Sequence, residues 1–89
     1  MRRSGDFLLR EVADTQVVVP IGAAANEFYG MVTLNAVGVY IWQLLEKEQT
    51  IQSLTEALME EYAVEREQAQ KDVEAFVNSL IPIGAILEN

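Results

Sequence analysis

The chain of 89 residues contains no cysteine and no histidine. Without cysteine it can form neither a disulfide nor a thiolate metal site, and without histidine it lacks the usual general base of nucleophilic catalysis. It also has no run of about 20 apolar residues, the length that a membrane-spanning helix needs, and no apolar run of signal-peptide length. We therefore expect a soluble, cytoplasmic protein that makes no use of a membrane.

Positive charge is scarce and unevenly placed. Fourteen acidic residues and six basic ones give a net charge of −8, and the only bases after Asn35 are Lys47, Arg66 and Lys71. Nucleic-acid binding requires clustered basic side chains that neutralise phosphates. The charge pattern therefore predicts a protein that does not bind nucleic acid.

Carboxylates are the remaining candidates for chemistry. Glu60, Glu61, Glu65 and Glu67 lie close together in the sequence and could act as an acid–base pair or hold a hard cation. Their neighbours are polar, which favours a solvated surface instead. The five glycines match neither a dinucleotide-binding nor a phosphate-loop spacing. We predict no catalytic residues, no metal site and no cofactor, and hence no enzymatic activity of the chain's own.

The first third of the chain predicts a sheet. About half of the residues are apolar, enough for one core in a single domain of residues 1–89. Runs of β-branched and aromatic residues at 7–12, 15–22 and 27–34 are separated by turn residues. This pattern is typical of a meander of three antiparallel strands.

The period becomes helical from Asn35, a good N-cap for a first helix. Thr50 can cap a second helix, and a third is expected to begin near Glu65 or Arg66 and to end before Pro82. A three-stranded sheet followed by three helices indicates an α+β, winged-helix-like fold.

The apolar sides of these helices are expected to form the core, the second with a stripe of Ile51, Leu54, Leu58 and Tyr62. The first is rich in apolar residues, and Ile41 and Trp42 should fix the sheet to the other helices. The apolar tail 85–87 is expected to pack back on the core. In the third helix, five residues are expected to point inward: Ala69, Val73, Phe76, Val77 and Leu80.

The third strand is the candidate interaction surface. An edge strand exposes unpaired N–H and C=O groups, and proteins usually protect it with Lys, Pro or an inward charge. Residues 29–33 carry none of these. Such an edge could accept a peptide strand, or it could be covered by a loop, the C-terminal tail or a second copy of the chain. Asp72, at the border of the third helix's apolar side, faces either solvent or a groove.

A further set of residues is spread over nearly the whole chain: Leu34–Asn35, the IWQLL segment at 41–45, Thr50, Leu54, Leu58, Tyr62, Asp72, Val73, Phe76, Leu80 and Ile86–Leu87. In order and spacing these residues resemble the PqqD family. The resemblance implies a RiPP recognition element, a module that binds the leader segment of a ribosomally made precursor peptide and presents the precursor to a modifying enzyme. In many members that enzyme is a radical SAM protein.

The resemblance also implies where the leader would bind. It would add as a strand to the third strand, in a groove walled by the third helix. Carried over to this sequence, the expected peptide-binding residues are Phe28, Tyr29, Gly30, Met31, Val32, Thr33, Ala69, Asp72, Val73 and Phe76. An acidic helical half should also favour leaders that carry Lys or Arg.

Two alternatives share the same fold. A winged-helix DNA-binding regulator would need a basic recognition helix, whereas the third helix has more acids than bases. A structural or scaffold subunit could pair as a homodimer through the exposed strand. The chain itself is thus expected to be a monomer or a homodimer.

Overall fold

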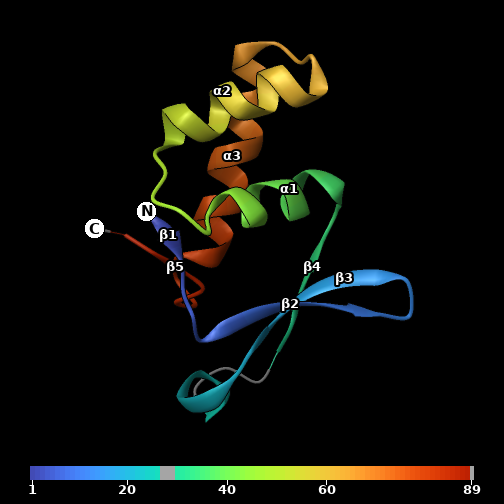
Figure 1. Cartoon of the computed structure of the whole chain (residues 1–89), viewed down its shortest axis with the longest axis vertical. Helices are drawn as coiled ribbons and strands as arrows, with labels where there is room; N and C mark the ends of the chain where they lie inside the picture. Colours follow the sequence, from blue (N-terminus) through green and yellow to red (C-terminus); the bar gives the residue numbers. More distant parts are fainter. Residues whose placement is uncertain (27–29, 89) are drawn as a thin grey trace.

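The computed structural model describes residues 1–26 and 30–88, so the predicted strand residues Glu27, Phe28 and Tyr29 lie outside the described part. The helices gather at one end of the molecule and the sheet lies at the other (Figure 1). This arrangement confirms the predicted α+β class. The elements in chain order are β1 (Arg2–Arg3), β2 (Phe7–Val12), β3 (Thr15–Pro20), the 3-10 helix η1 (Gly22–Asn26), β4 (Val32–Leu34), α1 (Ala36–Leu44), α2 (Ile51–Tyr62), α3 (Arg66–Leu80) and β5 (Ile86–Leu87).

The main sheet is the predicted antiparallel meander, with strand order β2-β3-β4. Ala13 and Asp14 join β2 to β3 with φ angles of 50° and 67°. Positive φ at both positions is the geometry that matches the twist of a two-residue hairpin. β3 is therefore the central strand, and β2 and β4 form the two edges.

β4 is shorter than the predicted third strand. Gly30 and Met31 are exposed and belong to no strand, so the predicted start is wrong for these two residues. Pairing of β3 with β4 runs from Gln16↔Leu34 to Val18↔Val32. Two steps further, the same register would set Gly30 opposite Pro20, which has no N–H to donate.

All three helices begin where the sequence predicts, and the first two have side-chain caps. The Asn35 side chain accepts a hydrogen bond of 2.8 Å from the Gly38 N–H at the start of α1. Thr50 and Ser53 form a reciprocal capping box at the start of α2. α3 begins at Arg66 without a side-chain cap and ends at Leu80, as expected from Pro82.

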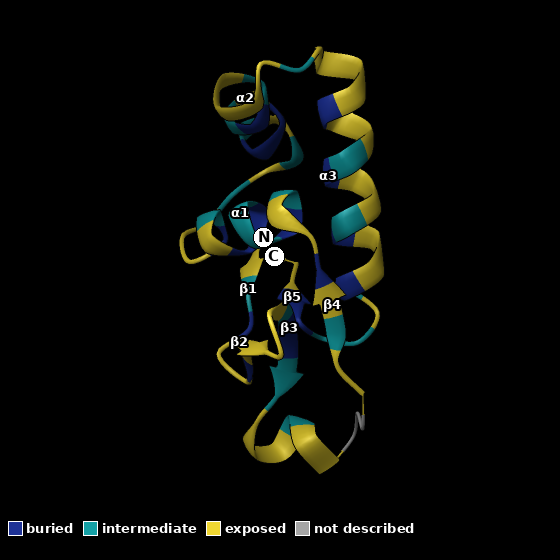
Figure 2. Ribbon diagram, turned by 90° about the vertical axis from the view of Figure 1, so that its right-hand side faces the viewer, coloured by how far each residue is buried: buried dark blue, intermediate teal, exposed yellow. Residues whose placement is uncertain are grey.

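One core joins the sheet to all three helices. Ile41 and Trp42 of α1 are almost fully buried, as predicted. In Figure 2 the inner sides of α1, α2 and α3 are buried and their outer sides are exposed. The buried residues of the core are Phe7, Val18, Leu34, Ile41, Trp42, Leu45, Leu54, Leu58, Ala69, Val73, Val77, Leu80, Ala85 and Ile86.

The two ends of the described chain form a second, smaller sheet. Arg2 of β1 pairs with Leu87 of β5, and Arg3 pairs with Ile86. This pairing confirms that the apolar tail packs back on the core, although sequence analysis did not predict β1. Within residues 1–26 and 30–88, none of the helices has the length and apolar character to cross a membrane.

Candidate functional site

A hollow of about 340 Å³ lies between β4 and α3, with the first turns of α1 as its floor. Figure 2 shows β4 beside the C-terminal part of α3. We call this hollow the β4–α3 groove. Its lining residues are Val32, Thr33, Leu34, Asn35, Val37, Gly38, Ile41, Asp72, Ala75, Phe76 and Ser79.

β4 supplies a strand edge to this groove. It pairs with β3 on one side, and within the described residues no strand pairs with it on the other. The N–H and C=O groups that point away from β3 on an edge strand can hydrogen-bond to an added chain. The groove thus combines a free backbone edge with a partly apolar hollow.

α3 presents two neighbouring stripes of side chains. Asp72, Ala75, Phe76 and Ser79 line the groove. These positions are three and four residues apart, which places them on one side of a helix. The second stripe is buried in the core: Ala69, Val73, Val77 and Leu80.

This division corrects two of the predicted groove residues. Ala69 and Val73 have no exposed surface and do not line the hollow, because they belong to the stripe that packs on α2 and the sheet. Four predicted residues do line it: Val32, Thr33, Asp72 and Phe76. Gly30 and Met31 lie exposed just before β4, and Phe28 and Tyr29 are outside the described residues.

Gly38 is a lining residue that sequence analysis missed as part of the site. A Cβ atom at this position would stand 3.2 Å from Cε2 of Phe76 and 3.4 Å from both Asn35 Oδ1 and Leu34 Cβ. A contact of 3.2 Å is tighter than ordinary packing, so a side chain at this position would require the Phe76 ring to shift by a few tenths of an ångström, whereas glycine lets the ring lie against the backbone of α1. The one available signal was a glycine inside an otherwise apolar helix.

The groove carries one charged side chain. Asp72 is half-buried at its rim, and its Oδ1 accepts a hydrogen bond of 2.9 Å from Gln68 Nε2. Among the described residues, no cation forms an ion pair with this carboxylate. An incoming basic side chain would therefore meet an acid that is not already neutralised.

The chemical groups that line the groove suit binding. Ser79 is its only hydroxyl on α3, and that hydroxyl donates to the Phe76 carbonyl oxygen at 2.8 Å. No group of three or more potential metal ligands occurs among the described residues. The lining thus offers shape, apolar surface, a strand edge and one carboxylate.

The sequence model of the family described as coenzyme PQQ synthesis protein D (PqqD) matches residues 15–86. No curated protein sequence matches the chain.

Two solved structures resemble the whole chain. One is described as TbiB1 in complex with the TbiA(beta) leader peptide, with a TM-score of 0.76 and 24% identity over 100% of this chain and 98% of that one. The other is lasso peptide synthetase B1 complexed with the leader peptide, with a TM-score of 0.72 and 25% identity over 98% of this chain and 96% of that one. These matches support the fold over its full length.

Proposed function

This chain belongs to the coenzyme PQQ synthesis protein D (PqqD) family, and on that premise we propose that it is a non-catalytic protein that binds the leader segment of a ribosomally made precursor peptide. The observation that carries the proposal is the edge of β4, unpaired among the described residues, beside a partly apolar hollow on α3. Two proteins of the same fold, at 24% and 25% identity, were solved with leader peptides.

In the proposed complex the leader adds as a further strand to β4. Main-chain hydrogen bonds to the β4 edge would supply affinity, and the groove would supply specificity by accepting alternate side chains of the added strand. The residues proposed to contact the leader are Val32, Thr33, Asp72, Ala75, Phe76 and Ser79, which line the groove. Gly30 and Met31, which precede β4, and Phe28 and Tyr29, which lie outside the described residues, are proposed as further contacts.

The energetics of this mode are moderate. Burial of one large apolar side chain in the groove contributes about 1.5 to 3 kcal/mol. Ordering a flexible leader costs about 2 to 5 kcal/mol of the gross interaction energy. A net affinity near micromolar, or about −8 kcal/mol, is therefore expected once the main-chain hydrogen bonds are included.

The bound leader would hold the precursor near a modifying enzyme. We assign that enzyme to the radical SAM class because the sequence resembles a family whose members commonly serve such enzymes. In this arrangement the chemistry lies in the partner.

Binding of fluorescein-labelled leader peptides, taken from precursors encoded beside the gene of this chain, tests the proposal. Fluorescence anisotropy should give saturable binding, and Phe76→Ala should weaken it at least about tenfold by removing a ring that lines the groove. Met59→Ala, which truncates a half-buried side chain of α2 away from the groove, is the matched control and should bind as the wild type does.

Light scattering with and without leader separates this function from a scaffold homodimer. If the chain forms a dimer that persists unchanged when peptide is bound, the β4 edge is not the peptide site. Equal binding by the wild type and Phe76→Ala would place the leader somewhere other than the β4–α3 groove.

A further inference from the structure

A second hollow lies at the other edge of the sheet. Its volume is about 700 Å³, and we call it the β2-edge hollow. It shares no lining residue with the β4–α3 groove. Helix α1 contributes to both, with Ile41 in the groove and Trp42 in this hollow. Its lining residues are Arg2, Arg3, Ser4, Gly5, Phe7, Leu8, Leu9, Trp42, Gln43, Glu46 and Leu87.

Arg3 is held in place within this hollow. Its Nη1 donates a hydrogen bond of 3.2 Å to the Trp42 carbonyl oxygen, and its guanidinium carbon lies 5.8 Å from the centre of the Trp42 ring. A guanidinium has five N–H donors, so most of them remain available for another acceptor. A fixed, planar guanidinium is well suited to bind a carboxylate through two parallel hydrogen bonds.

Apolar side chains stand beside the two arginines. Leu8 of β2 is 43% exposed and Leu87 of β5 is 42% exposed, which places both among the most exposed large apolar side chains of the described residues. Leu87 is the direct partner of Arg2 in the β1–β5 register. The hollow therefore offers cationic and aliphatic contacts side by side.

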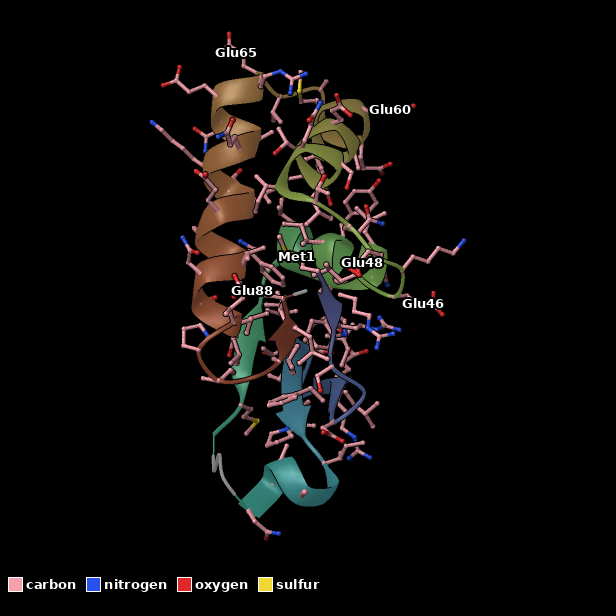
Figure 3. All side chains as sticks on the ribbon, turned by 90° about the vertical axis from the view of Figure 1, so that its left-hand side faces the viewer. Met1, Glu46, Glu48, Glu60, Glu65 and Glu88 are labelled. Carbon is pink, nitrogen blue, oxygen red and sulfur yellow. The ribbon has the colours of Figure 1, made fainter. Side chains whose placement is uncertain are left out.

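The charge of this region differs from that of the rest of the molecule. Two arginines and one acid, Glu46, line the hollow, although the whole chain has a net charge of −8. Figure 3 shows Glu60 and Glu65 at the helical end, and Glu46, Glu48 and Glu88 around β1 and β5. Of these three, Glu48 pairs with the N-terminal amino group of Met1, and Glu46 lines the hollow. An acidic partner would be repelled by the helical end and attracted to the arginines.

We propose that the β2-edge hollow is a docking surface for an acidic segment of a partner protein. An aliphatic side chain of that segment would pack against Leu8 and Leu87, and an adjacent Asp or Glu would pair with Arg2 and Arg3. This inference goes beyond leader binding. Because the two hollows share no lining residue, a leader and this partner could bind at the same time.

Selection from a random 12-residue peptide library, displayed on phage and panned against the full chain, tests the surface without a known partner. We expect enrichment of peptides that place Asp or Glu next to Leu or Ile. Their binding can be followed by fluorescence of Trp42, the only tryptophan, which lines the hollow.

Matched variants identify the binding residues. Arg2→Gln and Arg3→Gln should each weaken the selected peptides at least about fivefold, since each removes a charge-assisted contact. Arg10→Gln removes the same charge from β2 outside the hollow and should leave affinity unchanged. Glu46→Gln removes the one acid of the hollow and should tighten binding about twofold, a gain that a damaged fold cannot produce.

Several results would overturn the inference. The first is an enriched pool of peptides without acidic residues, and the second is an equal loss of peptide affinity in Arg10→Gln and Arg2→Gln. The third is a loss of peptide binding in Phe76→Ala, because that loss would place the peptides in the β4–α3 groove. Capture of a second copy of the chain, or of duplex DNA, in place of acidic peptides would also contradict it. None of these results bears on leader binding, which is measured separately with labelled leaders.

Discussion

At the scale of single residues, Gly38 and Phe76 determine the shape of the β4–α3 groove. Phe76 is only half-buried, so its ring has room to move toward the hollow. Because Gly38 has no side chain, the ring can lie back against α1. A Cβ at this position would come within 3.2 Å of the ring. The depth of the groove thus depends on a residue that need not touch the peptide.

Gly38→Ala should separate stability from binding. Gly38 is the third residue of α1, and alanine at a helical position is favoured over glycine by up to about 1 kcal/mol, which offsets the close contact with the Phe76 ring. The free energy of unfolding should therefore stay equal or rise, whereas leader affinity should fall by about 1 kcal/mol, or roughly fivefold, as Phe76 is pushed into the groove. Urea unfolding and calorimetric titration measure both quantities.

The control for this change is Gly5→Ala, because a Cβ at Gly5 would have no atom within 4 Å. This variant should bind leader as the wild type does. Unchanged leader affinity in Gly38→Ala would show that the Phe76 ring does not limit the groove.

Asp72 should select leaders that carry a basic residue. Its carboxylate lies at the rim of the groove without an ion-pair partner among the described residues. We expect Asp72→Asn to weaken binding of a Lys-containing leader by about 0.4 to 1 kcal/mol, or roughly two- to fivefold, and the difference should shrink at high salt. Glu74→Gln, an exposed neighbour on α3 outside the groove, is the control. If Asp72→Asn weakens binding of the leader and of its Lys→Gln version equally, the proposed preference of Asp72 for a basic residue is contradicted.

At the scale of elements, the sequence predicted what local rules determine. The helix starts followed from Asn35 and Thr50, and the β2–β3 turn followed from its spacing, because caps and tight turns involve only neighbouring residues. β1 was missed because two residues are too few to show a period, and their partner β5 is more than 80 residues away. Contacts at that distance are set by the packed core.

The groove on the third helix was expected from the resemblance to the PqqD family. The expected residues mixed the two stripes of α3, since Ala69 and Val73 differ from Asp72 and Phe76 by about one hundred degrees or less around the helix. Which stripe meets the core depends on how α3 lies against α2 and β4. That angle is a property of the assembled elements.

The contact between α1 and α2 predicts a dependence on pH. Tyr40 and Tyr62 meet edge to face, with ring centres 5.8 Å apart. Burial of Tyr40 raises its pKa above the ordinary 10.0, and the nearby Glu61 and Glu60 raise it further. The folded state therefore favours the neutral phenol. The stability that this provides is fully present below pH 10 and is lost as pH rises through the raised pKa.

Tyr40→Phe should remove the part of the stability loss above pH 10 that comes from ionisation of this phenol. We expect the urea midpoint of the wild type to fall above pH 10, and that of Tyr40→Phe to fall less steeply over the same range. Measurements at pH 8, where the wild-type phenol is neutral in both states, give the effect of the hydroxyl alone. Identical slopes in the two proteins would show that Tyr40 does not link stability to pH.

At the scale of the whole molecule, the sheet has two edges with different surroundings. β4 faces the groove that we propose for the leader, and β2 lies beside the arginine-lined hollow that we propose for a protein partner. α1 lies between them and contributes adjacent residues to each. The proposed leader and the proposed protein partner would therefore occupy separate surfaces of this small fold.

The most direct test of the central claim is an amide chemical-shift titration of the isotope-labelled chain with a candidate leader. The account predicts saturable shifts concentrated on residues 30–38 and 72–79, which are lost in Phe76→Ala while its remaining spectrum shows a folded protein. Shifts confined to other surfaces, or none in these two segments at saturating leader, would contradict leader binding in the β4–α3 groove and leave only the fold established.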